Sequence, residues 1–229
     1  YHDFVIRGGG IRVFPRLVSS EHRRAFEPER VASGIAELDQ LLGGGVERGT
    51  STLLVGSAGT GKSTLAAQFL AAAAARGEAG AAFLFDESKE MLLRRCALLG
   101  VDIGQHVESG RIVLHPVDPA ELSPGELVDR VRYEVEQRDA RAILIDSLNG
   151  YTNAMPHEHY LESQMHELLA YLGQRGVVTL LVAAHTGLIA TQMGLSIDPS
   201  YLADTVILMR YFEARGEVRQ AVSIVKKRG

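Results

Sequence analysis

The stretch Leu53-Leu54-Val55-Gly56-Ser57-Ala58-Gly59-Thr60-Gly61-Lys62-Ser63-Thr64 decides the fold of this chain. Three apolar residues, typical of the end of a buried strand, lead into Gly-x-x-x-x-Gly-Lys-Ser, and the alanine-rich run that follows predicts a helix. Glycines let such a loop turn its backbone N–H groups towards a polyphosphate, and the start of the helix adds partial positive charge. The stretch therefore predicts a phosphate-binding P-loop, in which Lys62 reaches the β- and γ-phosphates of a nucleotide and the Ser63 hydroxyl binds Mg²⁺.

Outward from this loop, the hydrophobic pattern alternates between strands and helices. We expect strands at 51–55, 81–85, 112–115, 142–145 and 177–184, and helices at 37–42, 62–75, 88–99, 124–137 and 157–173. Two further strands, 205–212 and 218–225, flank a turn at Gly216. The sequence therefore predicts an α/β fold with a mainly parallel sheet, helices on both faces and a C-terminal antiparallel hairpin.

The N-terminal part of the chain has a different character. Residues 1–18 predict a small hairpin around three glycines, residues 19–30 a polar linker interrupted by Pro28, and residues 31–229 the main domain. The chain begins without methionine and without a signal-like segment, so we expect it to be an excised piece of a longer protein.

Composition narrows the class of protein. With 229 residues, 46% apolar and 23% charged, the chain is typical of a globular domain with a sizeable core. A net charge of −4 gives no general attraction to nucleic acid or to an anionic membrane, and the longest apolar runs are too short to cross a bilayer. The single cysteine, Cys96, excludes an intrachain disulfide and fits a reducing cytoplasm.

Polar residues at the carboxyl ends of the expected strands are candidates for ligand binding, because open parallel sheets bind ligands there. Strand 142–145 is followed by Asp146. Two strand–helix units after a P-loop, this acid predicts the Walker B carboxylate, which holds the Mg²⁺ shell opposite Ser63. The alternative is an ordinary strand-end turn residue.

Two adjacent acids, Asp86 and Glu87, follow strand 81–85 at the same edge. Hydrolysis needs a carboxylate that orients and polarises the attacking water, and we expect Glu87 to be this base with Asp86 as its neighbour. The alternative is that Asp86 or Ser88 only caps the next helix.

Strand 177–184 is followed by His185 and Thr186, which we consider candidate sensors of the γ-phosphate. A half-buried strand-end histidine is an equally good interpretation. His157 and His159 are two residues apart and would point to different faces of a helix, so we do not expect them to bind a metal together.

Several motifs together resemble those of one ATPase family. They are the P-loop 56–63, the acid pair 86–87, Ile-Asp-Ser at 145–147, the run 203–208 and the stretches 213–217 and 226–229. Over residues 30–229 the chain resembles the KaiC-type branch of the RecA-like ATPases, the family of the circadian clock protein KaiC. The resemblance implies a RecA-like P-loop NTPase fold with ATP and Mg²⁺ as cofactors. Residues 1–18 resemble the connector between tandem modules of that family, which implies a preceding module.

The resemblance also implies roles for single residues. Asp86 and Glu87 match the positions of two catalytic glutamates, with Asp86 one methylene shorter. Lys226 and Arg228 match a Lys-x-Arg that family members project into the nucleotide site of the neighbouring subunit, which implies a homo-oligomeric ring, usually hexameric, with ATP at each interface. The alternative for this basic end is a solvated terminus. Ser200 matches a phosphoacceptor of an adjacent Ser-Thr pair, although Tyr201 replaces the threonine.

We therefore expect an ATP-hydrolysing, ring-forming signalling ATPase, with Ser200 as a candidate site of serine autophosphorylation and a signalling protein as a candidate partner. One alternative is a RecA-like recombinase or helicase driven along DNA by ATP. However, the segment 187–200 contains no basic residue to meet phosphates, so we do not expect nucleic acid as a partner. A third interpretation is a nucleotide-gated interaction module with little turnover.

Overall fold

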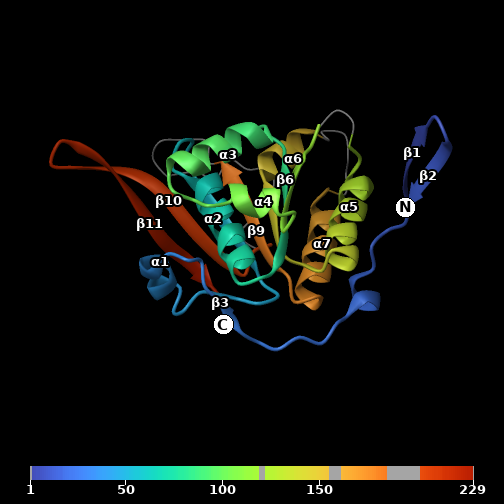
Figure 1. Ribbon diagram of the computed structural model, residues 1–229, viewed down its shortest axis with the longest axis horizontal. Helices are drawn as coiled ribbons and strands as arrows, with labels where there is room; N and C mark the ends of the chain where they lie inside the picture. The colour runs from blue at the N-terminus through green and yellow to red at the C-terminus, as the bar shows by residue number, and fades with distance from the viewer. Residues whose placement is uncertain (1, 119–121, 155–160, 185–201, 229) are drawn as a thin grey trace.

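The structure, a computed structural model, describes residues 2–118, 122–154, 161–184 and 202–228. Its centre is a seven-stranded sheet with the order β11-β10-β5-β9-β8-β6-β7 (Figure 1). The strands are β5 Ser51–Gly56, β6 Ala79–Leu84, β7 Ile112–Pro116, β8 Ala140–Asp146, β9 Val178–Ala184, β10 Thr205–Ala214 and β11 Glu217–Lys227. All neighbours are parallel except β10 and β11, which form an antiparallel hairpin at one edge.

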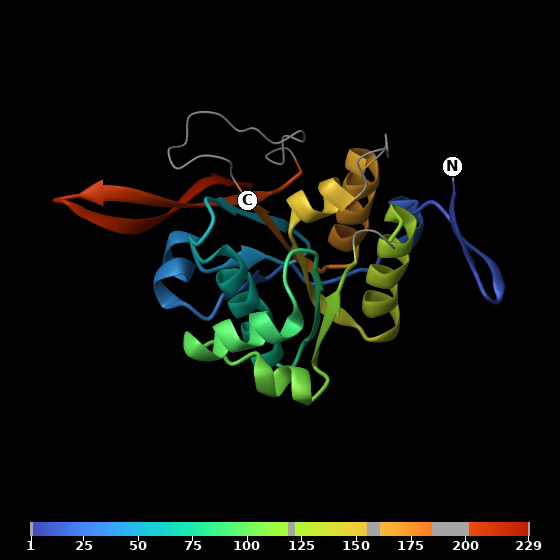
Figure 2. The ribbon, with the colours of Figure 1, turned by 90° about the horizontal axis from the view of Figure 1, so that it is seen from above.

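Helices cover both faces of this sheet (Figure 2). They are α1 Ala36–Leu41, α2 Lys62–Ala75, α3 Lys89–Leu98, α4 Gly104–Glu108, α5 Pro124–Gln137, α6 Leu148–Ala154 and α7 Leu161–Gln174. Successive strand residues point to opposite faces, so Leu53 packs into the core with α5, α6 and α7, whereas Leu54 packs into the core with α1, α2 and α3. Because both faces are buried, the strands are nearly continuous apolar runs.

The N-terminal residues form small elements outside the central sheet. Strands β1 Asp3–Arg7 and β2 Gly10–Phe14 form a hairpin that projects to one side in Figure 1, and its base is held by a hydrogen bond from the Gly125 N–H to Asp3. The 3₁₀ helix η1 Ser19–His22 follows, within the segment predicted to be a linker. Strands β3 Arg30–Val31 and β4 Val46–Glu47 form a separate two-stranded sheet next to α1.

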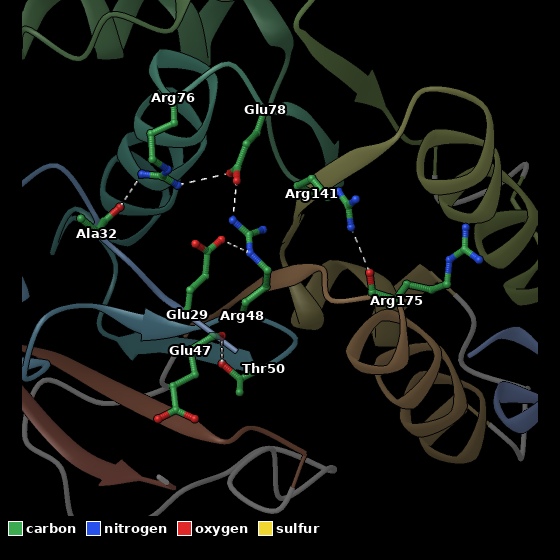
Figure 3. Close-up of polar contacts among 9 residues, drawn as sticks. All are labelled: Glu29, Ala32, Glu47, Arg48, Thr50, Arg76, Glu78, Arg141 and Arg175. Carbon is green, nitrogen blue, oxygen red and sulfur yellow. Dashed lines mark hydrogen bonds and ion pairs between the residues drawn. The ribbon is translucent and has the colours of Figure 1, made fainter. Parts of the chain in front are cut away.

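A buried arginine fastens this N-terminal segment to the amino end of the central sheet (Figure 3). Arg48, which lies between β4 and β5, donates hydrogen bonds to the carboxylates of Glu29 and Glu78. Burial by itself lowers the pKa of the Arg48 guanidinium, but the bonds to these two acids more than offset it and raise the pKa overall. The clamp therefore joins the start of β6 to the residues that precede β3.

The predicted α/β fold is confirmed: the sheet is mainly parallel, helices lie on both faces, and the chain closes with an antiparallel hairpin. The prediction missed α4, α6 and the strands β3 and β4, all of which are short. The helix predicted at 157–173 is described as α7 from Leu161, and residues 157–160 lie outside the described part of the chain. No helix among the described residues has both the length and the apolar character needed to cross a membrane.

Candidate functional site

The P-loop connects β5 to α2 at the carboxyl edge of the sheet. A Cβ on Gly56 would lie 2.0 Å from the carbonyl oxygen of Met209 in β10, so the neighbouring backbone leaves room only for glycine. Gly61, the N-cap of α2, has a φ of 87°, in the left-handed region that favours glycine. The loop folds on itself, because the Ser57 carbonyl accepts hydrogen bonds from the Thr60 hydroxyl and the Lys62 ammonium, both at 2.8 Å.

Lys62 is held inside this loop and is 8% exposed. Burial lowers the pKa of its ammonium group, and the nearby carboxylate of Asp146 acts against that shift. A buried cation whose ammonium bonds a backbone carbonyl lacks the full charge partner that a phosphate would supply. The residues predicted to bind nucleotide thus form a continuous cradle with Lys62 at its base.

Asp146, at the end of β8, is 5% exposed and lies next to the P-loop. Burial, the largest cause, and the charges of Glu87 and Asp86 together raise the pKa of its carboxyl to about 6, against the opposite effect of a hydrogen bond with Ser63. Its Oδ2 atom is buried and has no hydrogen-bond partner among the described residues. The structure therefore brings together the two side chains predicted to bind Mg²⁺.

These two residues fit Mg²⁺ that arrives with a nucleotide. Both offer oxygen, the donor that this hard cation prefers, and Mg²⁺ usually takes one or two protein ligands and completes its shell with phosphates and water. Within the described ranges no group of three or more His, Cys, Asp or Glu side chains forms a metal cage. The arrangement suits a metal shared with a substrate and gives no sign of a dedicated protein cage.

Glu87 and Asp86 follow β6 at the same edge, but each is engaged by another residue. Arg95 of α3 binds Glu87 through two hydrogen bonds, from Nη1 to Oε2 at 2.6 Å and from Nη2 to Oε1 at 2.7 Å. The Ser147 hydroxyl donates to Asp86 Oδ2. Glu87 and Asp86 both add to the negative charge near Asp146, so the predicted acids and the predicted metal ligand lie in one cluster.

Ser88 settles which residue caps the following helix. It is the N-cap of α3, and its hydroxyl accepts a hydrogen bond from the Met91 N–H at 3.3 Å. The alternative that Ser88 caps this helix is therefore confirmed, and the alternative that Asp86 does so is wrong. Neither Asp86 nor Glu87 caps α3, and both lie at the carboxyl edge of the sheet.

Two residues that the sequence analysis missed also shape this edge. Arg95 lies two helical turns after Ser88, a spacing that places a side chain on the same helix face and was available in the sequence. Asn149 of α6 fixes the end of β9: its Oδ1 accepts from the Ala184 N–H at 2.7 Å and its Nδ2 donates to the Ala184 carbonyl at 3.3 Å. No sequence signal marked Asn149, because α6 was not predicted. His185, Thr186 and Ser200 lie outside the described residues.

Lys226 and Arg228 lie at the amino ends of the parallel strands, whereas the P-loop of the same chain lies at their carboxyl ends. Lys226 is paired in register with Val206, near the start of β10, and its ammonium donates to the Ala203 carbonyl at 2.6 Å. Arg228 is 65% exposed at its side chain, and its Nη1 lies 3.7 Å from Asp204 Oδ1. The structure therefore does not bring these two cations to the chain's own P-loop.

A comparison with known protein families agrees with this site, which combines a P-loop, acids at the strand ends and a terminal hairpin. The family model described as "ATPase: KaiC" matches residues 31–229. The chain belongs to the KaiC ATPase family. The RecA-like fold implied by the sequence resemblance is consistent with the observed sheet, in which β9 separates the P-loop strand β5 from the strand β8 that carries Asp146.

Curated KaiC proteins are similar along the whole chain. The circadian clock oscillator protein KaiC of Picosynechococcus sp. is 25% identical over 228 residues, which are 100% of this chain and 44% of that protein. The circadian clock oscillator proteins KaiC of Synechococcus elongatus and Rippkaea orientalis are 26% and 25% identical over 228 residues, which cover 44% and 43% of their lengths. This KaiC-family chain thus spans less than half the length of these relatives.

Proposed function

We propose that this KaiC-family domain binds ATP with Mg²⁺ and hydrolyses it. The observation that carries the proposal is the buried Asp146 Oδ2, which lacks a hydrogen-bond partner within the described chain and lies next to Ser63 and the P-loop. A bare carboxylate oxygen in a buried site is costly unless a ligand completes it. A metal bound to a triphosphate provides that completion.

The residues divide the work as follows. The loop 56–64 binds the phosphates through backbone N–H groups, and Lys62 provides the cation at the β- and γ-phosphates. Ser63 and Asp146 would hold Mg²⁺, which supplies charge stabilisation at the phosphoryl oxygens when it is bound. Glu87 accepts a proton from the attacking water and orients it, and Asp86 adds negative charge beside it.

Titration of the protein with Mg-ATP, followed by phosphate release, tests this function. We expect Lys62→Met to abolish tight binding and hydrolysis, and Glu87→Gln to keep binding while it loses about 100-fold in turnover. The Glu87→Gln variant is the matched control, because it changes one atom and leaves the P-loop intact. Hydrolysis that survives in Lys62→Met would contradict the proposal.

We further propose that Lys226 and Arg228 serve the nucleotide site of a neighbouring subunit in a ring. Their place at the edge away from their own P-loop supports this assignment, as does the exposure of Arg228. Cations supplied in trans stabilise charge on the transferring phosphoryl group and make turnover depend on assembly. The hexameric state, the signalling partner and the cytoplasmic location predicted from the sequence remain parts of this proposal.

Turnover per subunit measured against protein concentration tests the ring. We expect it to rise with concentration in the wild type and to fall strongly at all concentrations in Lys226→Ala. Lys227→Ala is the matched control, because Lys227 donates to the Leu42 carbonyl of its own chain. A rate that is independent of concentration and unaffected by Lys226→Ala would contradict the proposal.

Ser200 is our proposed phosphoacceptor, on the strength of the sequence resemblance. Incubation with Mg-ATP should add one phosphate to the wild type and none to Ser200→Ala, as measured by mass spectrometry. An unmodified Ser200 in a protein that hydrolyses ATP would remove the kinase activity from the proposal and leave the ATPase activity in place.

A further inference from the structure

We propose that Arg95 is a positioning residue that withholds Glu87 from the attacking water until nucleotide phosphates compete for its guanidinium group. The inference rests on the proposed function, because it assigns a regulator to the same acid. It concerns a residue of α3 that no motif of the P-loop, the acid pair or the terminal hairpin includes.

The first support is the geometry of the pair. Both carboxylate oxygens of Glu87 accept a hydrogen bond from the same guanidinium, at 2.6 and 2.7 Å. The Glu87 side chain is 13% exposed, whereas the Arg95 side chain is 36% exposed. A carboxylate occupied on both oxygens by a planar fork is a weaker acceptor for a water proton than a free one, so Glu87 in this arrangement is a poor base.

The second support is that Arg95 does not release this contact by losing its proton. The hydrogen bonds that Arg95 donates to Glu87 raise the pKa of its guanidinium, and burial only partly offsets them, so Arg95 stays charged wherever the protein is folded. Glu87 becomes available only when the Arg95 side chain moves. Movement needs a second acceptor that attracts the guanidinium.

The third support is the connection of Arg95 to the P-loop helix. Its Nε donates to the Thr64 hydroxyl at 3.1 Å, and Thr64 is the residue after the proposed Mg²⁺ ligand Ser63. Arg95 also lies close enough to Asp146 for that carboxylate to raise its pKa. A triphosphate in the cradle would place several negative charges beside a guanidinium that is already anchored there, and it would compete with Glu87 for it.

Steady-state hydrolysis by the protein in its assembled form tests the inference with Arg95→Met. Methionine keeps an aliphatic stem for packing and removes the fork. We expect kcat to rise about three- to ten-fold, because bound phosphates release Glu87 from Arg95 only part of the time in the wild type and the variant releases it fully. Arg94→Met is the matched control, since Arg94 is an exposed neighbour on the same helix, and it should leave kcat unchanged.

A double-mutant comparison isolates the pair. In the Glu87→Gln background, Arg95→Met should no longer raise kcat, because the acid that it would release is absent. Arg95→Lys keeps the charge without the fork and should give a kcat between those of the wild type and Arg95→Met. If Arg95→Met unfolds, Arg95→Gln replaces it, with folding checked by binding of a fluorescent ATP analogue.

The outcomes separate this inference from the proposed function. Hydrolysis by the wild type that is lost in Lys62→Met supports the function whatever Arg95 does. An unchanged or lower kcat in both Arg95→Met and Arg95→Gln, with normal nucleotide binding, would overturn the inference alone. Absence of hydrolysis from the wild type and from both Arg95 variants would overturn both.

Discussion

At the amino end of the central sheet, Arg48 bonds the carboxylates of Glu29 and Glu78, whereas at the carboxyl end Asp146 keeps one oxygen that no described residue satisfies. Both ends contain charged groups with little exposure, and the carboxyl end also has the Arg95–Glu87 pair, but the Oδ2 atom of Asp146 has no partner there. Polar groups that are paired by their own chain contribute to stability, and groups left incomplete lower it until a ligand binds. Substitutions at the amino end should therefore lower the free energy of unfolding, whereas substitutions at the carboxyl end should lower ATP turnover.

The largest effect should come from Lys62→Met at the carboxyl end. We expect ATP hydrolysis to fall below detection, a loss of at least about 1000-fold, because the cation at the phosphates is lost. The free energy of unfolding of the ligand-free protein should stay the same or increase, since burial already lowers the pKa of Lys62 and its charge is held at a cost. Phosphate release and denaturant unfolding measure the two quantities. A large loss of stability would remove the contrast between the two ends.

The next effect should come from Arg48→Met at the amino end. Removal of the Arg48 side chain, which is 9% exposed, leaves Glu78 with only its longer contact to Arg76, at 3.4 Å, and should cost about 2 kcal/mol of the free energy of unfolding. Turnover per folded molecule should not change, because Arg48 lies at the other end of β5. Arg24→Met is the control: its pair with Asp139 is exposed and should contribute less than about 1 kcal/mol. A reduced turnover in Arg48→Met at full folding would contradict the division of roles.

Asp146→Asn should stabilise the ligand-free protein, in contrast to Arg48→Met. Because burial raises the pKa of Asp146 from 3.8 to about 6, the folded protein binds this proton more tightly than the unfolded chain. The contribution of the group to stability is therefore present below about pH 4 and is lost as the pH rises through 6. The gain from Asp146→Asn should grow mainly between pH 4 and pH 6 and level off at about 3 kcal/mol above pH 7. Thermal unfolding in a chelator measures it, and a gain that is the same at every pH would exclude Asp146 as its source.

Ser88→Ala should have the smallest effect on stability and turnover. It compares two adjacent residues of the carboxyl end, the helix cap Ser88 and the proposed base Glu87. Ser88 adjoins Glu87 but serves α3 as its N-cap, so its loss should cost about 1 kcal/mol of the free energy of unfolding. The turnover at saturating ATP should remain that of the wild type. Ser88→Thr, which keeps the hydroxyl, should recover most of the stability. A turnover as low as that of Glu87→Gln would mean that Ser88 belongs to the chemistry.

The sequence predicted the main elements because the determining signals are local. The glycines of the P-loop, the apolar runs of the strands and the serine before α3 each act within a few residues. The clustering of Asp146, Ser63 and the acid pair followed from the general rule for open parallel sheets, whereas the order of the strands needed the structure.

Contacts between distant segments escaped prediction. Asn149 fixes Ala184 across 35 residues, and Arg48 reaches Glu78 across 30 residues. Contacts of this kind depend on how helices and loops pack in the folded chain. No sequence periodicity in either of the two segments predicts them. Arg95 is different, because a helical wheel of α3 places it on the side of Ser88, and only the identity of its partner needed the structure.

Strand β5 would couple the nucleotide sites of neighbouring subunits in the proposed ring. At its far end it leads into the P-loop, and at its beginning the Ser51 N–H and hydroxyl bond Asp204 Oδ2, whose backbone carbonyl accepts from the N–H of Arg228. The six residues of β5, about 20 Å long, therefore connect the P-loop at one end to the backbone of Arg228 at the other. In the proposed ring, an axial shift of β5 would move the P-loop and the backbone of Arg228 together, so nucleotide binding at one site would be coupled to the position of the cations at the next.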